Sequence, residues 1–266
     1  MFCKLSLAAV AATFLSLVVA EGDWQARLSK PAIHPNLDFI EDGLQRYLPE
    51  ISFTLNKWND NRIPKECKDR VNNANDFDIY EIHYDDCGEP WLLCHDRNAP
   101  VSAETIASQF SKVPIGMRQW VRLLIDVPAP STSAYNAGGT IYLNNANGRM
   151  ISVLCHETAH STNMGGFPGD NFEDLWSGYD NDQGVPDNYA QTNMIENLAQ
   201  VTVVSIYDEN VPGGIQSIDP NWWQMQNQLR AMQKYGRLGG STTTLHVPGQ
   251  DKECVHHVSV GDIVTK

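Results

Sequence analysis

The segment LCHETAHS, residues 154–161, constrains the fold of this chain more than any other, because its two histidines can act together only on a helix. Positions i and i+4 of an α-helix lie on one face, so His156 and His160 can offer ring nitrogens to one metal ion. Glu157 would point beside that ion, where a carboxylate can take a proton from zinc-bound water. The segment therefore predicts one zinc ion per chain, with Glu157 as the general base of a hydrolytic reaction.

The distribution of charge agrees with a bound cation. The chain has 19 Lys and Arg against 32 Asp and Glu, a net charge of −13, which argues against nucleic acid and anionic membranes as partners. Between Ile151 and Leu229 there is no Lys or Arg, while carboxylates are frequent. This block favours a metal cation and, beyond it, basic substrates.

The first twenty residues, MFCKLSLAAVAATFLSLVVA, combine an early lysine, an apolar run and the small residues Val18 and Ala20 at a signal-peptidase site. We expect residues 1–20 to be removed and the mature chain to be a secreted monomer. Residues 21–266 are enough for one domain with a full core. An N-terminal pro-segment, if the protein has one, would lie within residues 21–75.

The number of cysteines also fits a secreted protein. Five cysteines remain after the signal peptide, and an oxidising environment favours two disulfides and one free thiol. Cys87 and Cys94 flank GEPWLL and are spaced to close a hairpin, although the sequence leaves the connectivity open.

Hydrophobic periodicity predicts an α+β domain with a mostly helical C-terminal half. The expected elements are one or two helices at 36–58 with a break at Pro49, strands at 76–87 and 90–94, a helix at 102–113 capped by Ser102, a strand at 138–146, the histidine helix, a polar loop at 163–187, and helices at 193–208 and 219–236.

The HExxH pattern of His156, Glu157 and His160 resembles that of the zincin metallopeptidases. This resemblance implies a small twisted sheet whose edge strand precedes the active-site helix and binds an extended peptide. The segment GGTIYLNNA, residues 138–146, occupies the corresponding place. It also implies a third zinc ligand, and the metzincin type is excluded because Gly166 stands where its third histidine would be and Asn163 where its glycine would be.

Two carboxylates compete for the role of third ligand. Glu196 in MIENLAQ resembles the gluzincin glutamate on a second helix, although Asn193 and Glu196 also fit a helix-capping box. Asp187 in GVPDNYA resembles, with departures, the aspzincin motif. We expect the metal ligands to be His156, His160 and Glu196, with Asp187 as the alternative. Tyr189 is the candidate hydrogen-bond donor to an oxyanion.

The whole chain also resembles a group of secreted fungal conidiation-specific proteins, through CGEPWLLC, VPIGMRQWVR and CHETAHS. The sequence thus leads to a main hypothesis, a secreted zinc metallopeptidase acting on peptides or proteins. The alternative is a secreted binding or spore-surface protein that keeps the zincin-like fold with little or no turnover.

Overall fold

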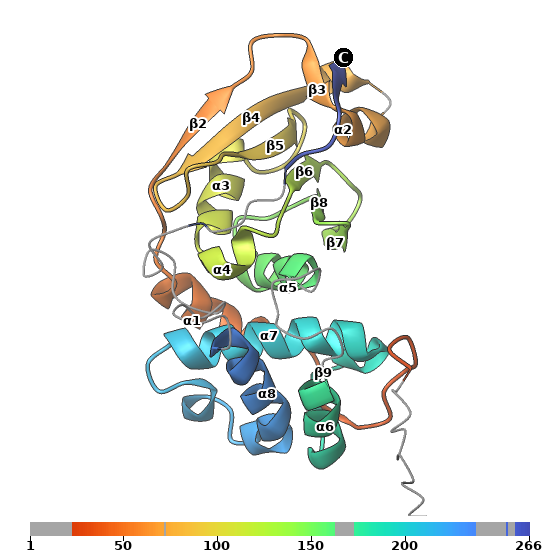
Figure 1. Cartoon of the computed structure of the whole chain (residues 1–266), viewed down its shortest axis with the longest axis vertical. Coiled ribbons are helices and arrows are strands. Elements are labelled where there is room, and N and C mark those ends of the chain that lie inside the picture. The colour runs from red at the N-terminus through yellow and green to blue at the C-terminus, as the bar shows by residue number, and fades with distance from the viewer. Residues whose placement is uncertain (1–22, 72, 163–172, 238–253, 255–258) are drawn as a thin grey trace, which may run out of the picture.

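The computed structural model describes residues 23–71, 73–162, 173–237, 254 and 259–266. Within these residues the protein is a mixed α/β structure, with its main sheet at one end of the molecule and most of its helices toward the other (Figure 1). The signal peptide expected at 1–20 lies outside the described residues. None of the described helices has the length and hydrophobicity that crossing a membrane requires.

The main sheet has six strands in the order β2-β4-β5-β6-β8-β7. β2 and β4 are antiparallel, as are β4 and β5, whereas β5, β6 and β8 run parallel and β7 returns antiparallel to β8. β7 therefore forms one edge. The strands are β2 (Phe53–Lys57), β4 (Phe77–Tyr84), β5 (Trp91–Asp96), β6 (Leu123–Val127), β7 (Ser133–Ala137) and β8 (Thr140–Asn144).

Two small sheets tie distant parts of the chain together. One pairs β1 with β9 in parallel, and the other pairs β3 with β10 antiparallel, so that the C-terminus joins an N-terminal segment. Their strands are β1 (Ala32–His34), β9 (Val185–Asp187), β3 (Arg62–Pro64) and β10 (Ile263–Thr265).

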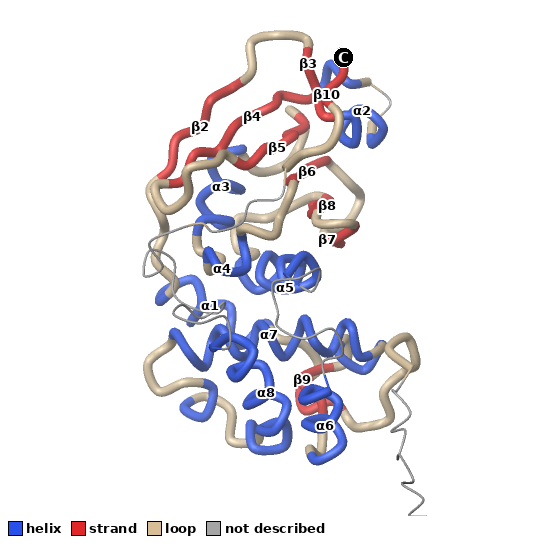
Figure 2. Tube along the Cα trace, viewed as in Figure 1, coloured by secondary structure: helices blue, strands red, loops and turns tan. Residues whose placement is uncertain are grey.

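Most of the helices form layers below one face of the main sheet, whereas α2 lies beside β3 and β10 (Figure 2). The histidine helix, α5, lies in the middle and packs against β7 and β8 on one side and against α1 and α7 on the other. α6 and α8 pack together beyond α7. The helices are α1 (Asp38–Tyr47), α2 (Lys65–Arg70), α3 (Ala103–Ser111), α4 (Ile115–Arg118), α5 (Ile151–Thr162), α6 (Glu173–Asn181), α7 (Met194–Asn210) and α8 (Gln226–Arg237), with short 3₁₀ turns at 74–76, 190–192, 215–217 and 222–225.

Successive side chains of a strand point to opposite faces of the sheet, and in this sheet both faces are covered. In β6, Leu124 enters the large core beneath the sheet, while Leu123 and Ile125 enter a smaller core on the opposite face. The large core also includes Ile40 of α1 and Leu154 of α5, which are fully buried. The histidine helix is therefore held from both sides by apolar contacts.

The N-terminal region is built into this core. α1 supplies buried Ile40 and Leu44, and its Glu41 carboxylate accepts hydrogen bonds from the backbone N–H groups of Ile151 and Ser152 at the start of α5. In this conformation the range 21–75, which was predicted to hold any pro-segment, supports the histidine helix directly.

Two disulfides are present among the described cysteines, Cys67–Cys94 and Cys87–Cys254, and Cys155 is free and buried. The predicted number is confirmed, but the hairpin pairing of Cys87 with Cys94 is not formed. Cys94 of β5 and Cys67 of α2 both lie in the smaller core, where they form a disulfide. Cys87, in the turn before β5, is instead bonded to Cys254 of the C-terminal segment.

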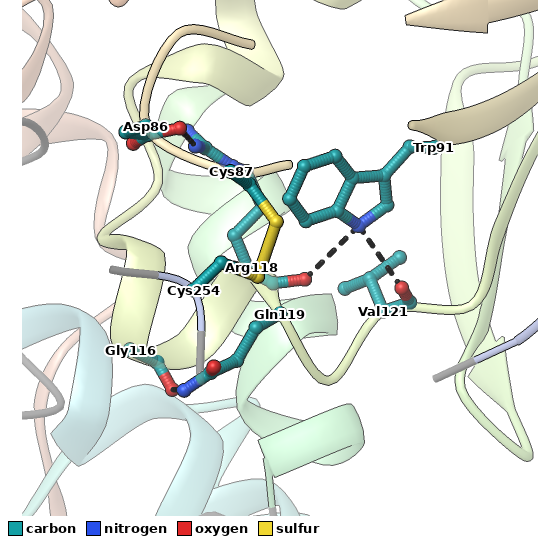
Figure 3. The surroundings of a disulfide bond; sticks show 8 residues. All are labelled: Asp86, Cys87, Trp91, Gly116, Arg118, Gln119, Val121 and Cys254. Atoms are coloured by element: carbon teal, nitrogen blue, oxygen red, sulfur yellow. Dashed lines mark hydrogen bonds and ion pairs between the residues drawn. A yellow bond between two sulfur atoms is a disulfide. The ribbon is translucent and has the colours of Figure 1, made fainter. Parts of the chain in front are cut away.

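The surroundings of Cys87–Cys254 are polar as well as aromatic (Figure 3). Arg118, fully buried, forms an ion pair with Asp86 and lies against the rings of Tyr84 and Trp91. The indole N–H of Trp91 donates to the carbonyl oxygens of Arg118 and Val121. The disulfide thus fastens the C-terminal segment to a region that is already ordered by a buried charge pair.

Three predicted elements need correction. Residues 53–57 form β2 and not helix, because their side chains alternate in burial and pair with β4. The predicted loop contains α6, whose Leu175 and Tyr179 are buried against neighbouring elements. The strand predicted at 138–146 is β8, which lies between β6 and β7, so the sheet edge belongs to β7. The predicted hairpin at 76–94 and the helices at 102–113 and 193–208 are confirmed as β4–β5, α3 and α7.

Candidate metal-binding site

Three side chains from two helices meet at one point on the surface of α5. The Nε2 atoms of His156 and His160 are 3.2 Å apart, and Oε2 of Glu196 lies 3.1 Å from the first and 3.2 Å from the second. His156 and His160 share one face of α5, while Glu196 comes from the first turn of α7. The three donor atoms therefore form a nearly equilateral triangle.

The local sequence explains how Glu196 comes to face the histidines. Asn193 is the N-cap of α7, and its side-chain oxygen accepts a hydrogen bond from the backbone N–H of Glu196. Half of the capping box is therefore formed. Because the Glu196 carboxylate contacts both histidines and does not turn back to the N-cap, it is available as a ligand.

Electrostatics couple the three groups. Burial by itself would raise the pKa of Glu196, but hydrogen bonds and charge interactions with His156 and His160 outweigh it and hold the pKa at about 2. Burial would lower the pKa of His156, but the hydrogen bond that it donates to Glu196 and the charges of Glu157 and Glu196 raise it above its ordinary value. These are the directions expected when a carboxylate and a cationic imidazole share a partly dry site.

His156 is held on its other side by a chain of two hydrogen bonds. Its Nδ1 lies 3.0 Å from Oε1 of Gln200, and Nε2 of Gln200 donates to Oδ2 of Asp187 at 2.7 Å. The other oxygen of Asp187 accepts from the backbone N–H of Ala190. Because the side-chain oxygen of Gln200 is an acceptor, it places a proton on Nδ1 and leaves Nε2 free to bind a metal.

This geometry separates the two candidates for the third ligand. The structure brings Glu196 to both histidines, whereas Asp187 lies behind His156 and acts through Gln200. Sequence reasoning missed Gln200. The signal was its position four residues after Glu196, which places both side chains on the same face of α7.

Glu157 and Tyr189 both reach the same region. Glu157 is 6% exposed, and no hydrogen bond joins its carboxylate to another described residue. Burial raises the pKa of that carboxyl group. Together with His156 and His160 it makes a group whose potential ligand atoms all lie within 4.8 Å, so it is near the histidines but farther from them than Glu196. Tyr189 is 52% exposed, and its ring centroid lies 5.5 Å from that of His156.

A cleft runs past the three donor atoms. A first cavity of about 400 Å³, here called the metal-side cavity, is lined by both histidines, Glu196, Tyr189 and residues of β7. A second of about 390 Å³, the far cavity, shares Ala134, His156, Glu157 and Tyr189 with it. His156 and Glu157 therefore line two adjoining hollows beside the edge strand β7.

β7 is fixed to α5 by Asn136, a second residue that sequence reasoning missed. Its Nδ2 donates to the Glu157 carbonyl oxygen at 2.9 Å and to Oγ of Ser161 at 2.7 Å. The edge strand and the histidine helix are thus linked directly by side-chain hydrogen bonds.

Comparison with known proteins finds similarity to one family, and that family is not described as peptidases. No solved structure matches it. Conidiation-specific protein 13 of Neurospora crassa is 29% identical over 181 residues, which cover 64% of this chain and 53% of that protein, so the match spans about half the length of the relative. A family model described as conidiation-specific protein Con-13 matches residues 36–236.

These matches correct the main hypothesis. The assignment to the zincin metallopeptidases, and with it the expectation of a hydrolytic enzyme, is wrong, because both matches are conidiation-specific proteins and neither is described as a peptidase. The resemblance of the whole chain to conidiation-specific proteins is confirmed. Since the family model covers well over half of its 266 residues, the chain belongs to the Con-13 family of conidiation-specific proteins.

Proposed function

We propose that this chain is an extracellular zinc-binding protein of conidiation, the formation of asexual spores, and that it holds a peptide ligand at its metal site without hydrolysing it. The observation that carries the proposal is the donor triangle of His156, His160 and Glu196. The family gives the biological setting, and the site gives the chemistry.

The residues fit a zinc ion. Two ligand atoms bound to zinc at 2.0–2.1 Å with tetrahedral angles lie about 3.3 Å apart. The three separations of 3.1–3.2 Å match one face of such a tetrahedron. Two imidazoles and one carboxylate are also a donor set that zinc prefers.

The surrounding residues support the same cation. Gln200 and Asp187 orient His156, as outer partners of metal-bound histidines do. No lysine or arginine lines the metal-side cavity, so nothing there competes with a bound cation for the Glu196 carboxylate.

The groups that line the cleft are suited to binding a peptide. Zinc held by three protein ligands would supply a Lewis-acidic position for an oxygen of the ligand. The edge of β7 that is not paired with β8 can add an extended strand through backbone hydrogen bonds. Glu157 can accept an N–H from the ligand, and the Tyr189 hydroxyl can donate to a ligand oxygen, since both line the cleft.

Two features support secretion. Cys67–Cys94 and Cys87–Cys254 are the kind of bonds that persist in an oxidising compartment. Residues 1–20 have the pattern of a secretory signal.

The test is the zinc content of the purified chain, measured by elemental analysis after removal of loosely bound metal. The wild-type protein is expected to carry about one zinc per chain, and His156→Ala, His160→Ala and Glu196→Ala are expected to lose it. Asp187→Asn and Glu157→Gln serve as matched controls that should retain the metal. Loss of zinc in Asp187→Asn but not in Glu196→Ala would reassign the third ligand, and a wild-type protein without zinc would reject the proposal.

Binding is tested separately from turnover. The zinc-loaded protein is incubated with a mixture of labelled peptides, and the peptides that it retains are analysed by mass spectrometry. We expect every retained peptide to be intact, both with the wild type and with Glu157→Gln. Peptides that are cleaved by the wild type and left intact by Glu157→Gln would contradict the binding-only function.

A further inference from the structure

The far cavity differs in character from the metal-side cavity. It extends from the shared residues His156 and Glu157 toward the start of α1, where Leu37 and Asp38 form part of its wall. Val153 of α5, 40% exposed, forms another part. Any peptide lying along β7 past the donor triangle would place a side chain in or beside this hollow, because Ser133 and Ala134 of β7 line it as well.

The walls combine apolar surface with one solvent-exposed carboxylate. Leu37, Ala134 and Val153 offer apolar contacts, while the exposed Asp38 lies in the first turn of α1 without an ion-pair partner among the described residues. The wall has two other carboxylates: Asp187 accepts hydrogen bonds from Ala190 and Gln200, and Glu157 is largely buried. The far cavity has no lysine or arginine among its lining residues.

Glu157 gives an independent reason to expect a ligand that brings hydrogen-bond donors. Glu157 is 6% exposed, its carboxylate has no hydrogen-bond partner among the described residues, and the residue lines both cavities. A buried acceptor without a partner is costly, and a ligand that donates a hydrogen bond removes that cost.

We propose that the far cavity is a subsite for a lysine or arginine side chain of the bound peptide. The methylene stem would lie along Leu37, Val153 and Ala134, and the cationic head would reach Asp38. Long basic side chains are suited to such a site because their stems are apolar and their heads remain in contact with water. This inference rests on the proposed function, since it assigns the specificity of the same cleft.

The experiment uses the full mature chain loaded with zinc, and its zinc content is verified first. The probes are fluorescently labelled, end-blocked heptapeptides of alanine in which one position at a time carries lysine, arginine, norleucine or glutamate. Norleucine has the stem of lysine without the charge. Fluorescence anisotropy gives the dissociation constant of each peptide at low and at high salt.

At one position of the peptide, lysine and arginine are expected to bind about fivefold more tightly than norleucine, the upper range for an exposed ion pair, and glutamate more weakly than norleucine. High salt should reduce the advantage of lysine. Asp38→Asn should bring lysine to the level of norleucine, and Asp38→Lys should make glutamate the preferred residue. Glu104→Gln is the matched control, because Glu104 is an exposed acid in the first turn of α3 and lines neither cavity.

The outcomes distinguish this inference from the function on which it rests. If zinc and peptides bind but lysine, norleucine and glutamate are equivalent at every position, the subsite is wrong and the proposed function stands. An advantage of lysine that survives in Asp38→Asn would also overturn the subsite. If the chain binds no zinc, or binds zinc but no peptide, both proposals fail.

Discussion

Nδ1 of His156 lies 3.0 Å from Oε1 of Gln200, and Gln200 is itself anchored to Asp187. This contact sets which ring nitrogen of His156 carries a proton. It makes Gln200 a positioning residue for the proposed metal site, although it would not touch the metal.

Replacing Gln200 with alanine is expected to weaken zinc binding by about 10- to 100-fold, the usual effect of losing an outer hydrogen-bond partner of a histidine ligand. Competition with a chromophoric chelator measures the dissociation constant. Gln224→Ala, which changes a glutamine outside the cleft, is the control. If Gln200→Ala binds zinc as tightly as the wild type while Glu196→Ala does not, Gln200 has no positioning role.

Glu41 of α1 caps the N-terminus of α5 with both carboxylate oxygens, which accept from Ile151 and Ser152. Glu41→Ala should lower the free energy of unfolding by about 1–2 kcal/mol, because two N–H groups at a helix N-terminus lose an anionic partner. Urea denaturation of the metal-free protein measures this change. Glu50→Ala, an exposed position just after α1, should leave the midpoint unchanged. Equal effects of the two substitutions would show that the cap contributes nothing specific.

Gly178 permits close packing of α6 on α8. A Cβ atom at Gly178 would lie 2.8 Å from the backbone N of Gln228 and 2.9 Å from the backbone carbonyl carbon of Asn227. Gly178→Ala should therefore destabilise the protein by about 1–3 kcal/mol, although alanine is the better helix former. Thermal unfolding followed by circular dichroism is the measurement. At Gly88 a Cβ meets nothing within 4 Å, so Gly88→Ala should be close to neutral; a stabilised Gly178→Ala would mean that the two helices can separate without cost.

The Cys67–Cys94 disulfide closes a segment with a sequence separation of 27. Replacing both cysteines with alanine should lower the free energy of unfolding by about 3–4 kcal/mol, because the unfolded chain gains the entropy of an open loop. Guanidinium denaturation under oxidising conditions measures the loss. Cys155→Ala is the control, since Cys155 forms no disulfide and its small buried side chain is replaced by one of similar size. A double variant as stable as this control would contradict the assigned pairing.

The sequence made parts of the site predictable because their spacing is local. His156 and His160 are four residues apart on one helix, and the helical period alone brings them together. The hairpin of β4 and β5 and the capped helix α3 were predictable for the same reason, as each depends on neighbouring residues. Local spacing did not determine which residue supplies the third donor atom. Glu196 and Asp187 are both acidic and both lie within a short stretch before or at the start of α7, and only the packing of α7 on α5 shows which of them meets the histidines.

Local sequence also could not predict which strand forms the edge of the sheet. Residues 138–146 read as a strand, and they form one, but whether a strand lies at the edge depends on which other strands pair with it. SAYNA has little hydrophobic character, and its place beside β8 and α5 is fixed by pairing and by the hydrogen bonds of Asn136.

What the sequence by itself determined is the chemistry that short spacing can specify: two histidines on one helix face and an acidic stretch of chain without lysine or arginine. The tertiary structure decided the rest. The approach of α7 to α5 brings Glu196 and Gln200 to the histidines, β7 forms the open edge, and α1 brings Asp38 to the far cavity. These contacts join residues dozens of positions apart, and they arise from burial of a shared core that local periodicity does not encode.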